Sequence, residues 1–298
     1  MLVHPGLVES IDEACPAAPT GALTCTRWAA RQSPSSVGEF MDATPILRVE
    51  SLVKRYGGLI AVDGASFEVR RGSITGLIGP NGAGKTTTFD MIAGAQPPTS
   101  GRVIFEGRDI TGVPTHELFH LGIVRSFQIP KEYGRLTVIE NLMLVPPDQP
   151  GESVWATWFR PGRVLARERE VLELADEALE FLGLTHLREE LAGNLSGGQK
   201  KLLELGRGMM TESKLVLLDE PGAGVNPTLM NKIIEMIQRL NSERGYTFCI
   251  VEHDMDLIAR LCDPVIVLVE GKVLTEGPMS EVSNDARVID AYFGGAAA

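Results

Sequence analysis

Residues 79–87, which read GPNGAGKTT, combine closely spaced glycines with one cation and two hydroxyl groups. A bound triphosphate needs converging backbone N–H donors, a mobile cation and a hydroxyl group for its magnesium ion. Lys85 can reach the outer phosphates as a point charge, and Thr86 can offer its hydroxyl to the metal. An ordinary glycine-rich turn would need neither residue. The candidate phosphate-binding loop comprises Gly79, Pro80, Asn81, Gly82, Ala83, Gly84, Lys85, Thr86 and Thr87.

An acidic pair, Asp219 and Glu220, follows the apolar run Leu215–Leu218. Such a run predicts a strand buried on both faces, and open parallel sheets bind ligands at the carboxyl ends of their strands. Nucleotide hydrolysis needs a carboxylate that holds magnesium and a base that orients water. We therefore predict that Asp219 is the metal partner and Glu220 the general base, with a solvated acidic turn as the alternative.

Two further polar side chains lie near predicted changes of chain direction. His253 follows the apolar run Thr247–Val251 and so falls at the same carboxyl edge as Asp219, where an imidazole can sense the terminal phosphate. Its alternative role is to cap a loop turn. Gln128 follows residues 122–127, and taken alone it is equally consistent with a plain surface glutamine.

A second glycine-rich segment, Leu195–Gln199, reads LSGGQ and precedes a predicted helix at Lys200–Met210. Free N–H groups and the helix dipole at the amino end of a helix favour an anion. The loop at residues 79–87 already engages the phosphates in this chain, so the second segment is predicted to serve the nucleotide of another chain. This implies a head-to-tail dimer, and a serine-capped helix without functional consequence is the alternative.

The elements that must position these residues alternate between strand-like and helical patterns. Apolar runs at Ile74–Ile78 and Pro264–Val269, with helical segments such as Thr87–Ala93 and Thr228–Asn241, predict a doubly wound, mainly parallel α/β core. Short strand-like pieces between residues 46 and 112 predict an antiparallel β layer around the first of these strands.

Between Gln128 and Leu195 the apolar residues recur with a helical period. Leu165–Leu182 predicts a helix of a helical subdomain at about residues 129–195. Its predicted apolar face is formed by Leu172, Ala175, Leu179 and Leu182. Before this helix, a proline-rich stretch carries three aromatic residues that either dock a partner or form a local core, namely Trp155, Trp158 and Phe159.

Composition limits the remaining possibilities. The 298 residues include 28 Lys and Arg against 39 Asp and Glu, a net charge of −11 without a basic stripe, which argues against nucleic acid as a partner. No apolar run approaches the roughly 20 residues that span a bilayer, so a membrane function would need separate subunits. The four cysteines lack metal-site spacing and fit a reducing cytosol. Residues 1–44 are predicted to be disordered.

Taken together, these motifs make residues 45–295 resemble the ATP-binding subunit of ABC transporters. The resemblance implies an ABC cassette of the P-loop NTPase fold with ATP and Mg²⁺ as ligands. It implies that Tyr56, otherwise a half-buried strand aromatic, stacks on adenine, that Gln128 contacts magnesium and couples to the membrane partner, and that Asp219 holds the metal. It also assigns Glu220 to hydrolysis and His253 to a switch. The implied signature motif comprises Ser196, Gly197, Gly198 and Gln199.

Within this family, several short sequence segments of the chain resemble those of the ATP-binding subunits of branched-chain amino acid importers. The shared segments include YGG at residues 56–58, RSFQ at 125–128, GAGVNP at 222–227 and AYFG at 291–294. Asn226 stands where most ABC subunits carry aspartate, and this subfamily often shares the change.

The importer resemblance implies several partners: two membrane-spanning permeases, a second ATP-binding subunit that is either identical or related, and a substrate-binding protein. It places the chain peripherally on the cytoplasmic face of the inner membrane. Lipid or lipopolysaccharide export, urea or amide uptake, and a soluble ABC protein without a membrane partner stay open as alternatives.

Overall fold

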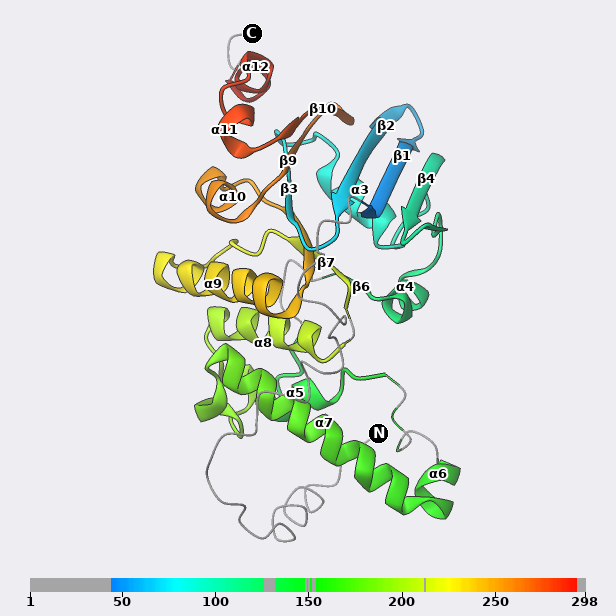
Figure 1. Ribbon diagram of the computed structural model, residues 1–298, viewed down its shortest axis with the longest axis vertical. Helices are drawn as coiled ribbons and strands as arrows, with labels where there is room; N and C mark the ends of the chain where they lie inside the picture. Colours follow the sequence, from blue (N-terminus) through cyan, green and yellow to red (C-terminus); the bar gives the residue numbers. More distant parts are fainter. Residues whose placement is uncertain are drawn as a thin grey trace. The chain divides into compact units, whose positions relative to one another are not determined.

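The larger of two sheets has six strands in the order β10-β9-β3-β8-β7-β6 (Figure 1). The five neighbouring strands from β9 to β6 pair in parallel, and only the edge strand β10 is antiparallel. Its strands are β3 (Ile74–Ile78), β6 (Ile123–Arg125), β7 (Leu215–Asp219), β8 (Thr247–Val251), β9 (Val265–Val269) and β10 (Lys272–Gly277). Every residue of β3, β7 and β8 is buried, as the apolar runs predicted.

The computed structural model describes residues 44–125, 132–147, 149, 151, 154–211 and 213–293. All of them belong to one unit of the chain, Met41–Ala298. The extension for which disorder was predicted lies outside the described residues except at Thr44, and so does Gln128.

A second, antiparallel sheet has the strand order β2-β1-β4-β5. Its strands are β1 (Pro45–Tyr56), β2 (Leu59–Arg70), β4 (Ser100–Phe105) and β5 (Arg108–Asp109). Apolar residues of β1, β2 and β4 share one core cluster with residues of the parallel sheet, for example Leu47, Phe67 and Leu77. This is the antiparallel layer that the sequence predicted, and the whole arrangement confirms the predicted α/β cassette fold.

Helices follow most strands of the parallel sheet. α3 (Lys85–Ile92) follows β3, α9 (Pro227–Arg244) follows β7, and α10 (Met255–Leu261) follows β8. α11 (Met279–Val282) and α12 (Ala286–Phe293) follow β10, whereas α4 (Thr115–Leu121) precedes β6. Asn226 caps α9, because its side-chain oxygen accepts a hydrogen bond of 2.9 Å from the Leu229 N–H. Among the described helices, none has both the length and the apolar composition that crossing a bilayer requires.

The described residues between 132 and 194 are mainly helical, with α5 (Val138–Met143), α6 (Val154–Phe159) and α7 (Pro161–Leu182). Of these, α5 and α7 pack with α8 (Gly197–Met209), whereas α6 packs on α7. Figure 1 shows α8 between α7 and α9. The predicted apolar face of α7 is wrong at one position. Leu172 is only partly buried, and Val171 takes its place beside Ala175, because at 100° per residue Val171 lies nearer than Leu172 to the centre of the buried face.

The aromatic residues of α6 do not form a local core. Trp155, Trp158 and Phe159 are all exposed, and the first and last stack on each other with ring centroids 5.4 Å apart. Of the two described cysteines, Cys249 is buried in β8, and burial raises the pKa of its thiol to about 12. It is a buried core residue without thiolate character.

Candidate active site

The glycine-rich loop connects the carboxyl end of β3 to the start of α3. Two of its positions require glycine. Gly79 has φ 153°, and a Cβ atom there would lie 2.0 Å from the carbonyl oxygen of Leu268; Gly84 has φ 94°, and its Cβ would lie 2.3 Å from the carbonyl oxygen of Ala61. The neighbouring backbone therefore leaves no room for side chains, and the chain can wrap closely around an anion.

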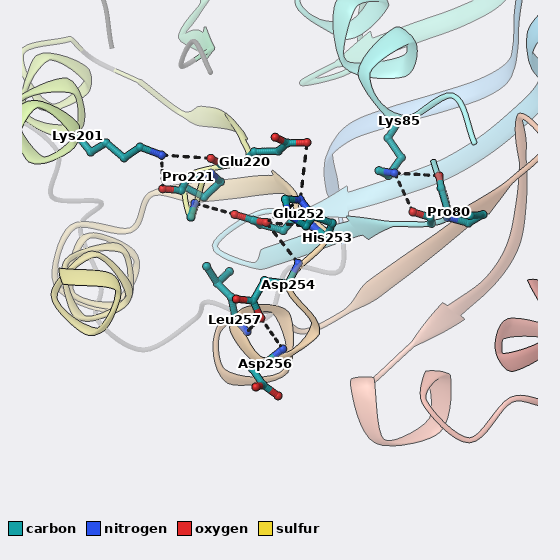
Figure 2. A network of polar contacts seen from close by, with 12 residues as sticks. Pro80, Lys85, Lys201, Glu220, Pro221, Glu252, His253, Asp254, Asp256 and Leu257 are labelled. Atoms are coloured by element: carbon teal, nitrogen blue, oxygen red, sulfur yellow. Dashed lines mark hydrogen bonds and ion pairs between the residues drawn. The ribbon is translucent and has the colours of Figure 1, made fainter. Parts of the chain in front are cut away.

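Lys85 begins α3 and folds back into the loop. Its Nζ atom donates hydrogen bonds to the carbonyl oxygens of Gly79 at 2.8 Å and Pro80 at 3.1 Å (Figure 2). Burial lowers the pKa of Lys85, and the negative charges of Glu220 and Asp219 oppose this shift. The ammonium group is thus held inside the loop, within the field of both predicted catalytic carboxylates.

The predicted metal partner, Asp219, ends β7 and is buried. Its Oδ2 atom accepts a hydrogen bond of 3.0 Å from Arg125, which ends the neighbouring strand β6. The other arm of the same guanidinium group donates to Asp90 of α3, whose second oxygen accepts from Gln96 at 2.9 Å. The arginine therefore joins the end of the parallel sheet to the helix that follows the phosphate-binding loop.

Glu220 and His253 meet at the ends of the neighbouring strands β7 and β8. Glu220 has φ 49°, in the left-handed region, and its N–H donates to the carbonyl oxygen of Val251 at 2.9 Å. The Nδ1 atom of His253 lies 3.8 Å from a carboxylate oxygen of Glu220 and 3.6 Å from one of Glu252 (Figure 2). His253 is 64% exposed, so a ligand that arrives at this edge can contact its imidazole.

Tyr56 lies at the end of β1 with 44% of its surface exposed. Its hydroxyl hydrogen-bonds to the side-chain oxygen of Gln96, and Lys54 places its Nζ atom 5.2 Å from the ring centroid. These contacts fix the ring at the end of strand β1 and leave it accessible, as stacking on a nucleobase requires.

The LSGGQ segment forms the amino end of α8, which begins at Gly197. Ser196 and Gln199 make a reciprocal capping box: the serine hydroxyl accepts from the Gln199 N–H at 3.3 Å, and the glutamine oxygen accepts from the Ser196 N–H at 2.8 Å. A Cβ atom at Gly198 would lie 1.4 Å from Leu229 of α9, so glycine lets the two helices approach closely. The cap is real, and it does not exclude a role toward a second chain.

The chemistry of the donors fits magnesium bound together with nucleotide. Among the described residues, no group of three or more His, Cys, Asp or Glu side chains could hold a metal ion. Mg²⁺ prefers six oxygen ligands and commonly takes them from phosphates, water and only one or two carboxylates. The hydroxyl of Thr86 and the carboxylate of Asp219 suit this mode.

Three residues of the site were missed by sequence reasoning: Arg125, Lys201 and Glu252. Glu252 is 1% exposed, and Lys201 reaches the carbonyl oxygens that follow Asp219. A charged residue directly after a fully apolar strand, as Glu252 is, was the available signal. Arg125 and Lys201 gave none, because their partners lie 94 and about 20 positions away in the chain.

We predict that Arg125→Gln lowers the free energy of unfolding by about 2 kcal/mol, because Asp90 and Asp219 lose a charge-assisted partner in a partly buried site. Equilibrium urea unfolding measures this loss. Arg102→Gln is the matched control, since its ion pair with Glu50 lies on the surface and contributes less than about 1 kcal/mol. Equal losses in both variants would contradict a special role for Arg125.

Comparison with known families supports the class that this geometry indicates. Residues 62–223 match the profile of the ABC transporter family, and residues 272–298 match that of the branched-chain amino acid ATP-binding cassette transporters. The chain therefore belongs to the ABC transporter family, as its ATP-binding and ATP-hydrolysing subunit.

The chain is similar to proteins described as branched-chain amino acid transport ATP-binding proteins. It is 44% identical over 249 residues to the probable protein LivG of Archaeoglobus fulgidus, which covers 84% of this chain and 95% of the relative. Identity to the high-affinity protein BraF of Pseudomonas aeruginosa is 37%, with 84% and 98% covered. For LivG of Escherichia coli K12 it is 34%, with the same coverage.

Solved structures agree with this assignment. A nucleotide-free ATP-binding cassette from an ABC transporter superposes with a TM-score of 0.72 at 40% identity, covering 84% of this chain and all of the other. A cassette in its ADP conformation gives the same TM-score at 39% identity, with 84% and 99% covered. The fold of this chain is thus that of the ATP-binding cassettes of ABC transporters.

Proposed function

We propose that this chain energises the import of branched-chain or related hydrophobic amino acids by binding and hydrolysing ATP. The observation that carries the catalytic part is a convergence at one sheet edge. Gly79–Thr87, Asp219 with Glu220, and His253 follow the carboxyl ends of the neighbouring strands β3, β7 and β8. This edge is where nucleotides bind in doubly wound sheets.

The proposed reaction is attack of water on the terminal phosphorus of ATP. The bond from this phosphorus to the bridging oxygen breaks, ADP leaves, and the water proton passes to the Glu220 carboxylate. Loop N–H groups and Lys85 hold the phosphates, and Tyr56 stacks on the adenine. His253, whose Nδ1 atom lies 3.8 Å from Glu220, hydrogen-bonds to the terminal phosphate.

Magnesium, when bound, neutralises charge on the phosphates that develops during transfer. We assign its protein ligands to the Thr86 hydroxyl, Asp219 and Gln128. The last of these rests on family resemblance alone, because Gln128 lies outside the described residues.

The signature residues Ser196–Gln199 support a dimeric arrangement. They form the capped amino end of a 13-residue helix, whose N–H groups and dipole favour phosphate. The chain already has its own phosphate loop. We therefore assign this helix end to the nucleotide of a second ATP-binding subunit, identical or related, in a head-to-tail pair.

Two membrane-spanning permeases and a substrate-binding protein complete the proposed importer, with this chain on the cytoplasmic face of the membrane. We assign the docking of a partner to the surface around a cavity of about 1040 Å³, which α4 and residues 144–147 help to line. Apolar residues at its wall include Pro114, Phe119, Leu144, Pro146 and Leu205. The proteins named for branched-chain amino acid transport support the choice of substrate.

An uptake experiment tests this proposal. The full-length chain is produced together with candidate permeases and a binding protein from the same organism, in cells that lack their own leucine importers. We expect ATP-dependent uptake of labelled leucine, isoleucine or valine, which is lost with Glu220→Gln. Uptake of urea or amides alone, or outward movement of lipid, would reject the proposed substrate while retaining the ATPase.

A further inference from the structure

The short turn that follows the proposed base is held from two sides by charged side chains (Figure 2). On one side, Nζ of Lys201 donates to the carbonyl oxygens of Pro221 at 2.6 Å and Glu220 at 3.3 Å. On the other side, the Gly222 N–H donates to Oε1 of Glu252 at 2.7 Å. A cation and an anion thus bind complementary backbone groups of residues 220–222.

Glu252 is committed to this contact. It is almost completely buried, and its second oxygen accepts a hydrogen bond of 3.0 Å from the His253 N–H. A Cβ atom at Gly222 would lie only 2.7 Å from Oε1, so glycine permits the approach. A buried carboxylate is costly unless it is well hydrogen-bonded, and these backbone donors satisfy it.

Lys201 is similarly committed, although from another element. It belongs to α8, two residues after the capping residue Gln199. Burial lowers the pKa of Lys201, and the negative charges of Glu204, Glu252 and Glu220 oppose this shift. The turn is therefore joined both to the helix that carries the signature residues and to the residue before His253.

We infer that Lys201 and Glu252 are positioning residues that set the backbone of Glu220, and that Lys201 makes this position depend on α8. The inference rests on the proposed role of Glu220 as the base. A nucleotide of the partner subunit that docks at the amino end of α8 would then act on the base through one ammonium group. Catalysis tolerates little displacement of its groups, since about 1 Å can reduce a rate by about 100-fold.

The test uses the full-length chain carrying Lys201→Met or Glu252→Gln, singly and together. Methionine keeps most of the side-chain volume but removes the donors. Glutamine keeps the shape of glutamate, yet its amide group must face a backbone N–H in either orientation. We expect each variant to lower kcat for ATP about 10-fold or more while the Kd for MgATP changes less than about twofold.

Three further results are expected if both side chains act on the same turn. The losses in the double variant fall short of the product of the single losses, because neighbouring residues in one network are not additive. Lys201→Arg restores most of kcat, since it keeps donors and charge. Hydrogen exchange at the Gly222 amide accelerates in Glu252→Gln.

Two controls separate the inference from the proposed function. Lys214 directly precedes β7, at the end of the strand opposite to Glu220, and pairs with Glu106. The Lys214→Met variant should have the same kcat as the unaltered chain. If Glu220→Gln is inactive while Lys201→Met and Glu252→Gln hydrolyse ATP at full rate, the positioning roles are wrong and the base stands. If Glu220→Gln hydrolyses ATP at full rate, the proposed base is wrong and the inference falls with it.

Discussion

The Glu220→Gln variant is expected to bind MgATP normally and to hydrolyse it about 100-fold or more slowly. The side chain lies at the carboxyl edge of the parallel sheet, beside His253 and within the electrostatic reach of Lys85. Glutamine has the same shape and still orients water through its amide, but it cannot accept the proton. The loss should therefore fall on kcat and leave affinity intact.

Single-turnover hydrolysis and a binding titration measure the two quantities separately. Glu270→Gln is a close control, because Glu270 also has φ 49° and is exposed in the turn between β9 and β10. It should hydrolyse ATP at the rate of the unaltered chain. A Glu220→Gln variant with unchanged ATPase activity in the presence of its permeases would refute the assignment of the base.

The strands of the site could be predicted from sequence because their apolar runs are short and uninterrupted. β3, β7 and β8 occupy the expected residues, so the three polar segments that follow them had to share one sheet edge. This explains why the loop at residues 79–87, Asp219 with Glu220, and His253 were found together without knowledge of the fold.

The first residues of the helices were less predictable, because capping residues and glycines interrupt the helical spacing of apolar residues. The helix expected from Thr87 begins at Lys85, directly after Gly84 in a left-handed conformation. The helix expected from Lys200 begins at Gly197, since the capping box of Ser196 stabilises a first turn that contains two glycines. In both cases part of the functional segment, Lys85–Thr87 or Gly197–Gln199, belongs to the helix itself.

The polar network around the site could not be predicted from sequence. Arg125 contacts Asp219 only because β6 pairs with β7, and its second partner, Asp90, lies on a helix from another part of the chain. No spacing rule relates residues 35 or 94 positions apart. Such pairs follow from topology, so the fold must be known before the residues that position the catalytic carboxylates can be named.

Lys85→Ala is expected to weaken MgATP binding by about 10- to 100-fold, the equivalent of about 1.5–3 kcal/mol for hydrogen bonds to a charged group. The ammonium group donates hydrogen bonds to the carbonyl oxygens of Gly79 and Pro80, inside the curve of the loop. A bound phosphate offers it a formal negative charge in place of these neutral oxygens. This interaction stabilises the nucleotide-bound state, so removal of the Lys85 ammonium group should lower the affinity for MgATP.

Isothermal titration with MgATP, performed in the Glu220→Gln background to prevent turnover, measures this loss. Lys214→Ala controls for the removal of one positive charge, because Lys214 pairs with Glu106 on the surface. The stability of Lys85→Ala should change little, since the loop glycines and not the lysine shape the backbone at Gly79 and Gly84. Unaltered affinity in Lys85→Ala would mean that the backbone N–H groups alone hold the phosphates, and the lysine would then act only on the charge that develops during hydrolysis.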